Sequence, residues 1–192
     1  MLTLYFAPGS SSMAVQIALC ELGVSFEGKP MSFRNNDLRS PEYLALNPEG
    51  KVPTLVIDGR PLTEVGAILY FLAKRFPKAE LLPRDDIEAD ARALSWMSFA
   101  ASTLHPARRK GLDHANEVWG VADRRLGNGW AIGGYSIADI HLFRLYWRFA
   151  LSLRPAAEQF ANLTLHHARM MARPAVRQTI EIEAAIGYEL PA

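Results

Sequence analysis

The chain has 192 residues, of which 49% are hydrophobic and 21% are charged, and its formal net charge is +1. This composition is ordinary for a globular protein and excludes a largely disordered chain. Up to and including Lys78 there are 8 basic and 7 acidic residues, and 13 of each follow. Neither half has the basic excess that nucleic-acid-binding domains show, so no nucleic-acid partner is expected.

A single cysteine, Cys20, excludes an internal disulfide. No cysteine or histidine cluster has the spacing of a zinc site, so no metal cofactor is expected. The first residues lack the basic segment and long apolar run of a secretory signal, and no run of about 18 apolar residues predicts a membrane span. We therefore expect a soluble protein of the cytoplasm that needs no membrane.

The first 76 residues alternate between strand and helix patterns. The expected elements are a strand over 2–7, a helix over 13–22, a strand over 24–31, a short helix over 41–46, strands over 52–57 and 60–63, and a helix over 64–76. Gly23 marks the end of the first helix, and Pro77 marks the end of the last. The Asp58-Gly59 pair predicts a tight hairpin, because both positions of such a turn need positive φ.

Residues 77–83 have the composition of a connector, and only helices are predicted after them. The expected helices cover 86–104, 116–126, 136–151, 163–172 and 175–186. Ser136-Ile-Ala-Asp139 has the form of a capping box, in which the serine and the acid satisfy backbone N–H groups reciprocally. The sequence thus predicts a mixed α/β half followed by an all-helical half.

The turn between the first strand and the first helix is the first candidate for a chemical site. It holds Ser10, Ser11 and Ser12 at a helix N-terminus, where free N–H groups favour a bound anion. A hydroxyl in this place can donate a hydrogen bond to a thiolate and lower the pKa of the thiol. The alternative interpretation is that a serine only caps the helix, and we expect one of the three to do so.

Two further candidates each have a purely structural alternative. A cis bond between Val52 and Pro53 would aim backbone groups at an extended peptide-like ligand, whereas a trans proline is the commoner case. Glu64 precedes a helix whose free N–H groups can hold a carboxylate while Glu64 pairs with an ammonium. An acidic residue there also simply favours the helix dipole. The adjacent His166 and His167 are interpreted as surface residues rather than metal ligands, since neighbours on a helix point in different directions.

Four segments in one order resemble the cytosolic glutathione S-transferase family, and the resemblance covers nearly the whole chain. They are Tyr5-Phe-Ala-Pro-Gly-Ser-Ser-Ser12, Asn47-Pro-Glu-Gly-Lys-Val-Pro-Thr-Leu55, Leu62-Thr-Glu-Val-Gly-Ala-Ile68 and Ser136-Ile-Ala-Asp139. The resemblance implies an α/β thioredoxin-like domain over residues 1–77, which binds glutathione. It implies an all-α domain over residues 84–192, which carries the electrophile site.

Within the family, Pro8-Gly-Ser-Ser-Ser12 and Ser102-Thr-Leu-His105 are most similar to the bacterial beta class. That class usually has cysteine where this chain has Ser11. A cysteine can form a mixed disulfide with glutathione, whereas Ser11 can only hydrogen-bond to its thiol. The resemblance therefore implies catalysis by Ser11, with Tyr5 or the helix terminus as the alternative activating group.

The resemblance also implies a set of glutathione-binding residues. The Val52 backbone beside Pro53 pairs with the cysteinyl part, and Glu64 and Val65 hold the γ-glutamyl end. The remaining residues implied near the site are Lys51, His105 from the helical domain, and Asn36 or Asn35 where the family has a basic residue.

The leading hypothesis is a glutathione transferase that activates the thiol for attack on a small hydrophobic electrophile. The alternative is a non-enzymatic member of the same fold that serves as a binding or interaction module, which Ser11 and Val65 slightly favour. Isomerase, dehalogenase and peroxidase activities use the same thiolate, and the sequence does not separate them. The family also implies a homodimer, and Cys20 is expected to be a structural residue of the first helix.

Overall fold

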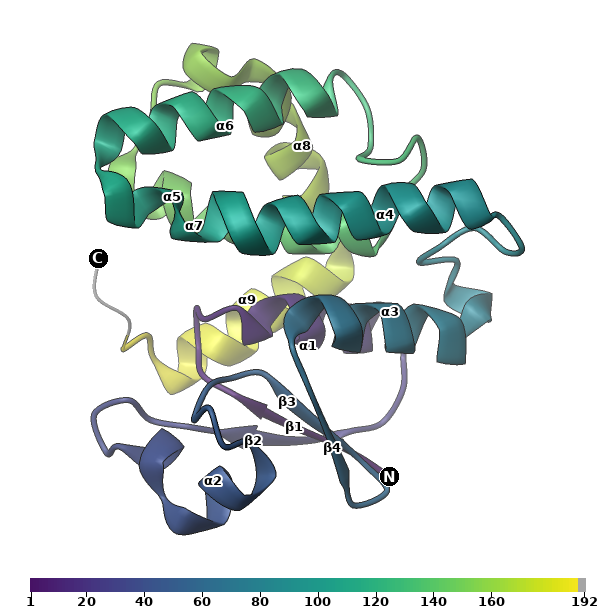
Figure 1. Cartoon of the computed structure of the whole chain (residues 1–192), viewed down its shortest axis with the longest axis vertical. Coiled ribbons are helices and arrows are strands. Elements are labelled where there is room, and N and C mark those ends of the chain that lie inside the picture. Colours follow the sequence, from purple (N-terminus) through teal and green to yellow (C-terminus); the bar gives the residue numbers. More distant parts are fainter. Residues whose placement is uncertain (190–192) are drawn as a thin grey trace. The chain divides into compact units, whose positions relative to one another are not determined.

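A computed structural model describes residues 1–189, apart from the side chains of residues 108 and 157. The first half of the chain forms a four-stranded sheet in the order β2-β1-β3-β4 (Figure 1). Its strands are β1 (Leu2–Phe6), β2 (Glu27–Pro30), β3 (Thr54–Ile57) and β4 (Arg60–Thr63). β1 runs parallel to β2 and antiparallel to β3, and β3 pairs antiparallel with β4. Asp58 and Gly59 join β3 to β4 with positive φ, as the hairpin prediction requires.

The helices of this half follow the predicted order. They are α1 (Ser12–Leu22), α2 (Pro41–Leu46) and α3 (Val65–Arg75). Pro30 and Pro61 lie in β2 and β4, the two edge strands, where a missing backbone N–H breaks no central ladder. The mixed sheet with its helices confirms the thioredoxin-like α/β fold expected for the first half.

The described chain packs as two compact units, one of residues 1–72 with the segment that begins at residue 174 and one of residues 73–173. The last helix, α9 (Pro174–Ile186), packs against α1 in the first unit, although it continues the helical half of the sequence. Its buried side chains repeat at helical spacing, with Val176, Thr179 and Glu183 on one face. The domain ranges 1–77 and 84–192 stay a prediction.

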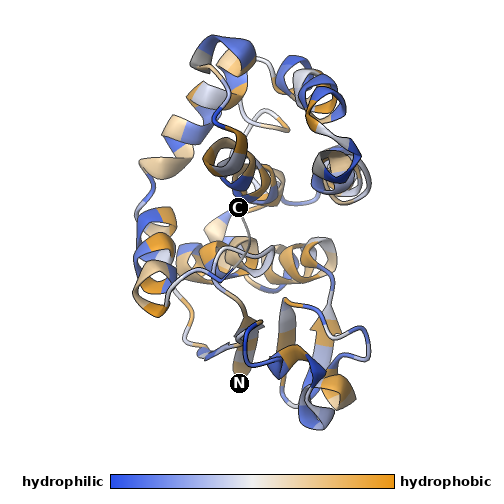
Figure 2. Cartoon of the chain, turned by 90° about the vertical axis from the view of Figure 1, so that its left-hand side faces the viewer, coloured by the Kyte–Doolittle hydropathy of each residue, from blue (hydrophilic) through white to orange (hydrophobic). Residues whose placement is uncertain are grey.

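The second unit consists of helices and loops in the part that the structure describes. Its helices are α4 (Ile87–Phe99), α5 (His105–Ala107), α6 (Leu112–Leu126), α7 (Ile137–Leu153) and α8 (Ala161–Met171), with a π-helical segment over Ala100–Leu104. Hydrophobic and hydrophilic bands alternate along these helices, as the burial of one face requires (Figure 2). None of the described helices is long and apolar enough to cross a membrane.

Aromatic side chains fill the core of the second unit. Trp119 in α6 stacks on Phe149 in α7 with ring centroids 4.9 Å apart, and Tyr146 meets the same tryptophan edge-on at 5.5 Å. Leu142 and Leu163 are buried beside them. Burial of these large apolar surfaces stabilises the helical unit.

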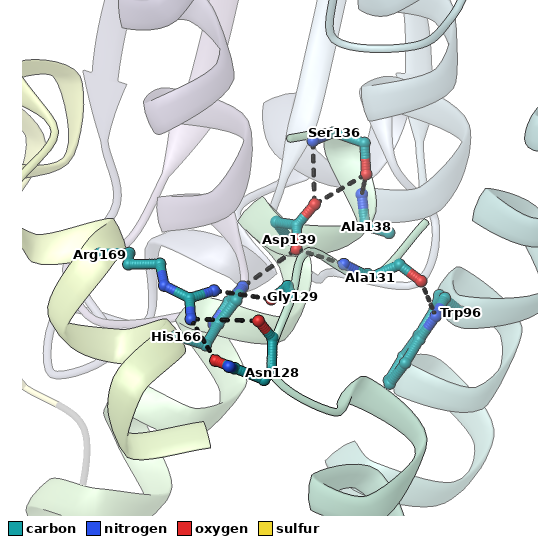
Figure 3. Close-up of polar contacts among 9 residues, drawn as sticks. All are labelled: Trp96, Asn128, Gly129, Ala131, Ser136, Ala138, Asp139, His166 and Arg169. Carbon is teal, nitrogen blue, oxygen red and sulfur yellow. Dashed lines mark hydrogen bonds and ion pairs between the residues drawn. The ribbon is translucent and has the colours of Figure 1, made fainter. Parts of the chain in front are cut away.

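A capping box starts α7, as Ser136 and Asp139 predicted (Figure 3). The Asp139 carboxylate accepts hydrogen bonds from the Ser136 N–H at 2.9 Å and from the Ser136 hydroxyl at 2.9 Å. Its other oxygen accepts from the Ala131 N–H at 2.8 Å and lies 3.1 Å from His166 Nε2. One carboxylate therefore joins the start of α7, the preceding loop and α8.

The surface placement predicted for the two adjacent histidines is wrong for His166, which is completely buried. The buried Asp139 carboxylate gives its ring a partner, and Trp130 packs edge-on against it at 5.7 Å. His167 is partly buried against Phe143. Local spacing could not reveal this, because Asp139 is distant from both histidines in the sequence.

His141 in α7 makes the stability of the protein depend on pH. Burial, together with the charges of Arg144 and His105, lowers the pKa of His141 to about 3. The folded protein therefore keeps this ring neutral below pH 6.5, where the unfolded chain takes up a proton. We expect the free energy of unfolding to fall between pH 6.5 and pH 3, with a slope from this group of at most about 1.4 kcal/mol per pH unit.

Urea denaturation at a series of pH values checks this prediction. His141→Leu should show a shallower loss of stability in that range than the parent. Equal slopes for His141→Leu and the parent would contradict it.

Candidate functional site

The three serines after β1 have different environments, which the sequence alone could not distinguish. Ser12 is completely buried, and its Oγ lies 3.1 Å from both the N–H and the carbonyl oxygen of Ala7. Its hydroxyl is also 2.6 Å from that of Ser10, which in turn accepts a hydrogen bond from the Ser12 N–H at 3.2 Å. The hydroxyls of Ser10 and Ser12 therefore both belong to a buried network, and the cap position of α1 itself falls on Ser11.

Ser11 differs from its two neighbours because its side chain reaches the surface. It stands at the cap position of α1 but makes no side-chain cap hydrogen bond, and it is only partly buried. Its hydroxyl has no hydrogen-bond partner in the described part of the chain. A hydroxyl in this state at a helix N-terminus is free to donate to an anion.

A buried carboxylate holds the turn that carries these serines. The N–H of Gly9, which has φ 72, donates to Glu183 Oε2 at 2.7 Å, and the Glu183 side chain is completely buried. The contact joins α9 to the loop after β1. The sequence analysis did not identify Glu183. Its spacing from Val176 and Thr179 puts it on the same face of α9, and this spacing could have indicated a buried carboxylate.

Tyr5, the predicted alternative to Ser11, lies in β1 beside Tyr43 of α2. The two ring centroids are 5.4 Å apart, and the Lys29 ammonium lies 5.4 Å from the centroid of the Tyr5 ring. No described contact joins Tyr5 to Ser11, so the part of Tyr5 in catalysis stays a prediction.

The segment before β3 is fixed by side chains rather than by regular structure. The Tyr43 hydroxyl and the Asn47 amide donate to the carbonyl oxygen of Lys51 at 2.5 and 2.8 Å. Both side chains also contact the Thr54 hydroxyl, at 2.9 and 3.2 Å. Burial raises the pKa of Tyr43, so its hydroxyl remains a neutral donor. Sequence reasoning did not foresee that Tyr43, Asn47 and Thr54 hold this segment.

The Val52-Pro53 peptide bond is cis, which is the first of the two conformations considered above. Lys51, just before it, is exposed, and its ammonium forms an ion pair with Glu49 at 2.7 Å. Val52 is partly buried and Pro53 is buried.

Glu64 has an unusual backbone conformation at the start of α3. Its φ of 68° lies in the left-handed region, which few residues other than glycine and asparagine adopt. The Glu64 side chain is exposed. The backbone carbonyl oxygen of Glu64 accepts the first hydrogen bond of α3, from the Ile68 N–H at 3.0 Å. Val65 is buried at the first helical position, 8% exposed. A tight turn thus presents the Glu64 carboxylate at the helix N-terminus.

The remaining predicted residues lie further along the two units. Asn36 is exposed in the loop after β2, with a φ of 59°, and Asn35 precedes it. His105 is exposed at the start of α5, in the second unit. The predicted residues of the first unit therefore lie in β1, at the start of α1, in the loop after β2, just before β3 and at the start of α3, whereas His105 belongs to the second unit. Among the described residues no group of three His, Cys, Asp or Glu side chains could hold a metal ion.

Cys20 lies in the last turns of α1 and is partly exposed, not fully buried. Burial raises the pKa of its thiol, although the Thr179 hydroxyl, which donates to Sγ at 3.7 Å, opposes the shift. Because the thiolate is the reactive form, we expect Cys20 to react slowly with an aromatic disulfide reagent at neutral pH, and much faster in the unfolded chain. Rapid labelling of the native protein, or a mixed disulfide with glutathione, would contradict its structural role.

A family model for the glutathione S-transferase N-terminal domain matches residues 1–74. The chain is 29% identical to glutathione S-transferase GstA of Escherichia coli O157:H7 over 94% of this chain and 98% of that protein. It is 30% identical to the glutathione S-transferase-like protein gedE of Aspergillus terreus, covering 90% of this chain and 91% of that one. It is 28% identical to a maleylacetoacetate isomerase of Pseudomonas aeruginosa, covering 88% and 90%.

Solved structures of glutathione transferases are similar to this chain as well. A glutathione transferase homologue from Sulfitobacter with bound glutathione is 32% identical, with a TM-score of 0.81 over 95% of this chain and 98% of that chain. A beta-class glutathione S-transferase from Sphingomonas chungbukensis is 31% identical, with a TM-score of 0.79 over 94% and 98%. Sequence and fold thus agree over nearly the full length of both proteins. The chain belongs to the glutathione S-transferase family.

Proposed function

We propose that the protein is a glutathione transferase that uses Ser11 to stabilise the thiolate of glutathione. The observation that carries the proposal is the state of the three serines. Ser10 and Ser12 are committed to a buried network, whereas the Ser11 hydroxyl is partly exposed at the N-terminus of α1. A donor hydroxyl and a helix terminus both favour the anion over the neutral thiol.

The chemistry is a substitution at an electrophilic carbon. The thiol loses its proton to solvent, the thiolate attacks the carbon of a small hydrophobic electrophile, and the leaving group departs with its electron pair. Ser11 keeps the sulfur charged and oriented, so the reacting atoms meet in a favourable geometry. The rate gain comes from the larger thiolate fraction and from this proximity.

The proposed binding residues divide glutathione among three segments of the first unit. The Val52 backbone, beside Pro53, pairs with the cysteinyl part. The Glu64 carboxylate takes the γ-glutamyl ammonium, and the free N–H of Val65 takes its carboxylate. Asn36 takes the glycine carboxylate, with Lys51 as a nearby cation. We also propose His105 as a contribution of the helical unit, and a cytoplasmic homodimer as the working form.

Calorimetric titration with glutathione, followed by turnover of a generic aryl halide, tests the proposal. Binding with turnover is the expected result. Binding without turnover would favour the non-enzymatic alternative, and an absence of binding would contradict both.

A glutathione-dependent isomerase is a second candidate, favoured by the similarity to the maleylacetoacetate isomerase of Pseudomonas aeruginosa. An isomerase returns glutathione unchanged, because the thiolate adds to the substrate and then leaves again. Consumption of glutathione during turnover therefore separates the two activities.

A further inference from the structure

Two glutamates of the C-terminal segment contact two different loops of the first unit. Glu183 accepts from the Gly9 N–H in the loop after β1, and Glu189, just beyond α9, accepts from groups in the loop after β2. β1 and β2 are adjacent and parallel, so both loops lie at the same edge of the sheet. That edge carries Ser11 and Asn36, the residues assigned above to the thiol and to the glycine end of glutathione.

The loop after β2 surrounds the Glu189 carboxylate with donors. Its Oε2 accepts from the Phe33 N–H at 2.6 Å and from the Arg34 N–H at 3.1 Å. The Ser32 hydroxyl lies 2.9 and 3.1 Å from the two carboxylate oxygens. Successive N–H groups that converge on one anion form a nest. The Arg34 N–H and the Ser32 hydroxyl lower the pKa of Glu189, so the carboxylate is charged at neutral pH.

Ser32 also links Glu189 to the conformation of the loop after β2. Its Oγ accepts from the Asn35 N–H at 3.0 Å while it donates to Glu189. The Ser32 N–H donates to Asp37 Oδ2 at 2.8 Å, and the Asp37 N–H donates back to the Ser32 carbonyl oxygen at 3.1 Å. Asn36, between these bonds, has a left-handed backbone. The orientation in which the loop presents Asn36 therefore depends on Ser32, and Ser32 on Glu189.

We propose that Glu189 is a positioning residue for the glycine end of glutathione. It holds Ser32 and the N–H groups of the loop, and through them it places Asn36 against the glycine carboxylate. The inference rests on the proposed function, in which Asn36 makes that contact. It concerns only one end of the co-substrate, which makes the effect separable from a general loss of stability.

Steady-state kinetics with two thiols test the inference. Glutathione contains the glycine, and γ-glutamylcysteine is the same molecule without it. In Glu189→Ala we expect the KM for glutathione to rise about fivefold, with kcat nearly unchanged, and in Glu189→Gln a smaller rise. The KM for γ-glutamylcysteine should stay at the parent's value in both variants. Glu181→Gln, at an exposed glutamate of α9, is the matched control and should change neither KM.

Ser32→Ala should reproduce the effect, and the double variant Ser32→Ala, Glu189→Ala should be no worse than either single one, because the two residues act as a unit. Equal KM changes for both thiols would indicate a general structural role and overturn the inference. An unchanged KM for glutathione in Glu189→Ala would also overturn the inference. A lower KM would overturn it too, because it would mean that Glu189 repels the glycine carboxylate. Should Glu189→Ala unfold, Glu189→Gln and Ser32→Ala decide by the same comparison. A parent protein that neither binds nor turns over glutathione would refute the proposed function itself, and this inference with it.

Discussion

Replacement of Asp139 by alanine is expected to lower the free energy of unfolding by about 3–5 kcal/mol, the usual cost of removing one partner from a buried polar pair. The carboxylate is completely buried and accepts hydrogen bonds from Ser136 and Ala131, with His166 Nε2 at 3.1 Å. Its removal leaves these donors, drawn in Figure 3, without their acceptor, and a buried donor that loses its acceptor is costly. Urea denaturation followed by circular dichroism measures the change.

Asp86→Ala is the matched control for this prediction. Asp86 caps α4 by accepting from the Ala89 N–H at 2.9 Å, but its side chain is exposed. The loss should be about 1 kcal/mol, as for an ordinary helix cap. Similar losses for Asp86→Ala and Asp139→Ala would show that Asp139 is no more than a cap and that its contacts with α8 and the preceding loop contribute nothing.

Replacement of Ser11 by alanine is expected to raise the pKa of bound glutathione's thiol by about one unit, a differential stabilisation of about 1.4 kcal/mol. The hydroxyl donates only to the anion, so affinity for the protonated thiol at low pH should stay at the parent's value. At a pH below the thiol pKa the thiolate fraction and the turnover should fall about tenfold. The ultraviolet absorbance of the thiolate, titrated against pH, measures the shift directly.

Ser10→Ala and Ser12→Ala are the controls. Each removes a hydroxyl from the buried network around Ala7, so we expect a loss of stability of about 1–3 kcal/mol before any change in the thiol pKa. If the thiol pKa rises in one of these variants and not in Ser11→Ala, the contact with the thiol belongs to that other serine. If no variant shifts the pKa, the helix terminus or Tyr5 activates the thiol. Ser11→Cys should react with glutathione disulfide to form a mixed disulfide and release one glutathione.

Local patterns predicted most of the secondary structure. The Asp58-Gly59 hairpin, the Gly23 end of α1 and the Ser136–Asp139 capping box all occur where the sequence placed them, because each depends on backbone preferences within a few residues. Boundaries were less accurate. α6 begins at Leu112 instead of residue 116, since no capping signal marks its first turn.

The candidate site was only partly predictable from such local patterns. Residue type and spacing identified the serine turn, the Val52-Pro53 bond and Glu64. They could not separate Ser11 from Ser10 and Ser12, because that distinction depends on contacts with Ala7 and on burial. Nor could they assign Glu183 and Glu189 to loops at the other end of the chain.

The sequence by itself determined the order of the elements, the mixed and helical halves, and the family resemblance, since these follow from periodicity, turn residues and short motifs. Only the tertiary structure shows that α9 packs on α1 and that the Asp139 carboxylate contacts His166. It also shows that two glutamates near the C-terminus contact the loops after β1 and β2. The physical reason is that these contacts join residues distant in sequence, so each of them depends on how the helices pack, and a polar group that packing buries needs a partner. Such pairings appear only when the helices have packed.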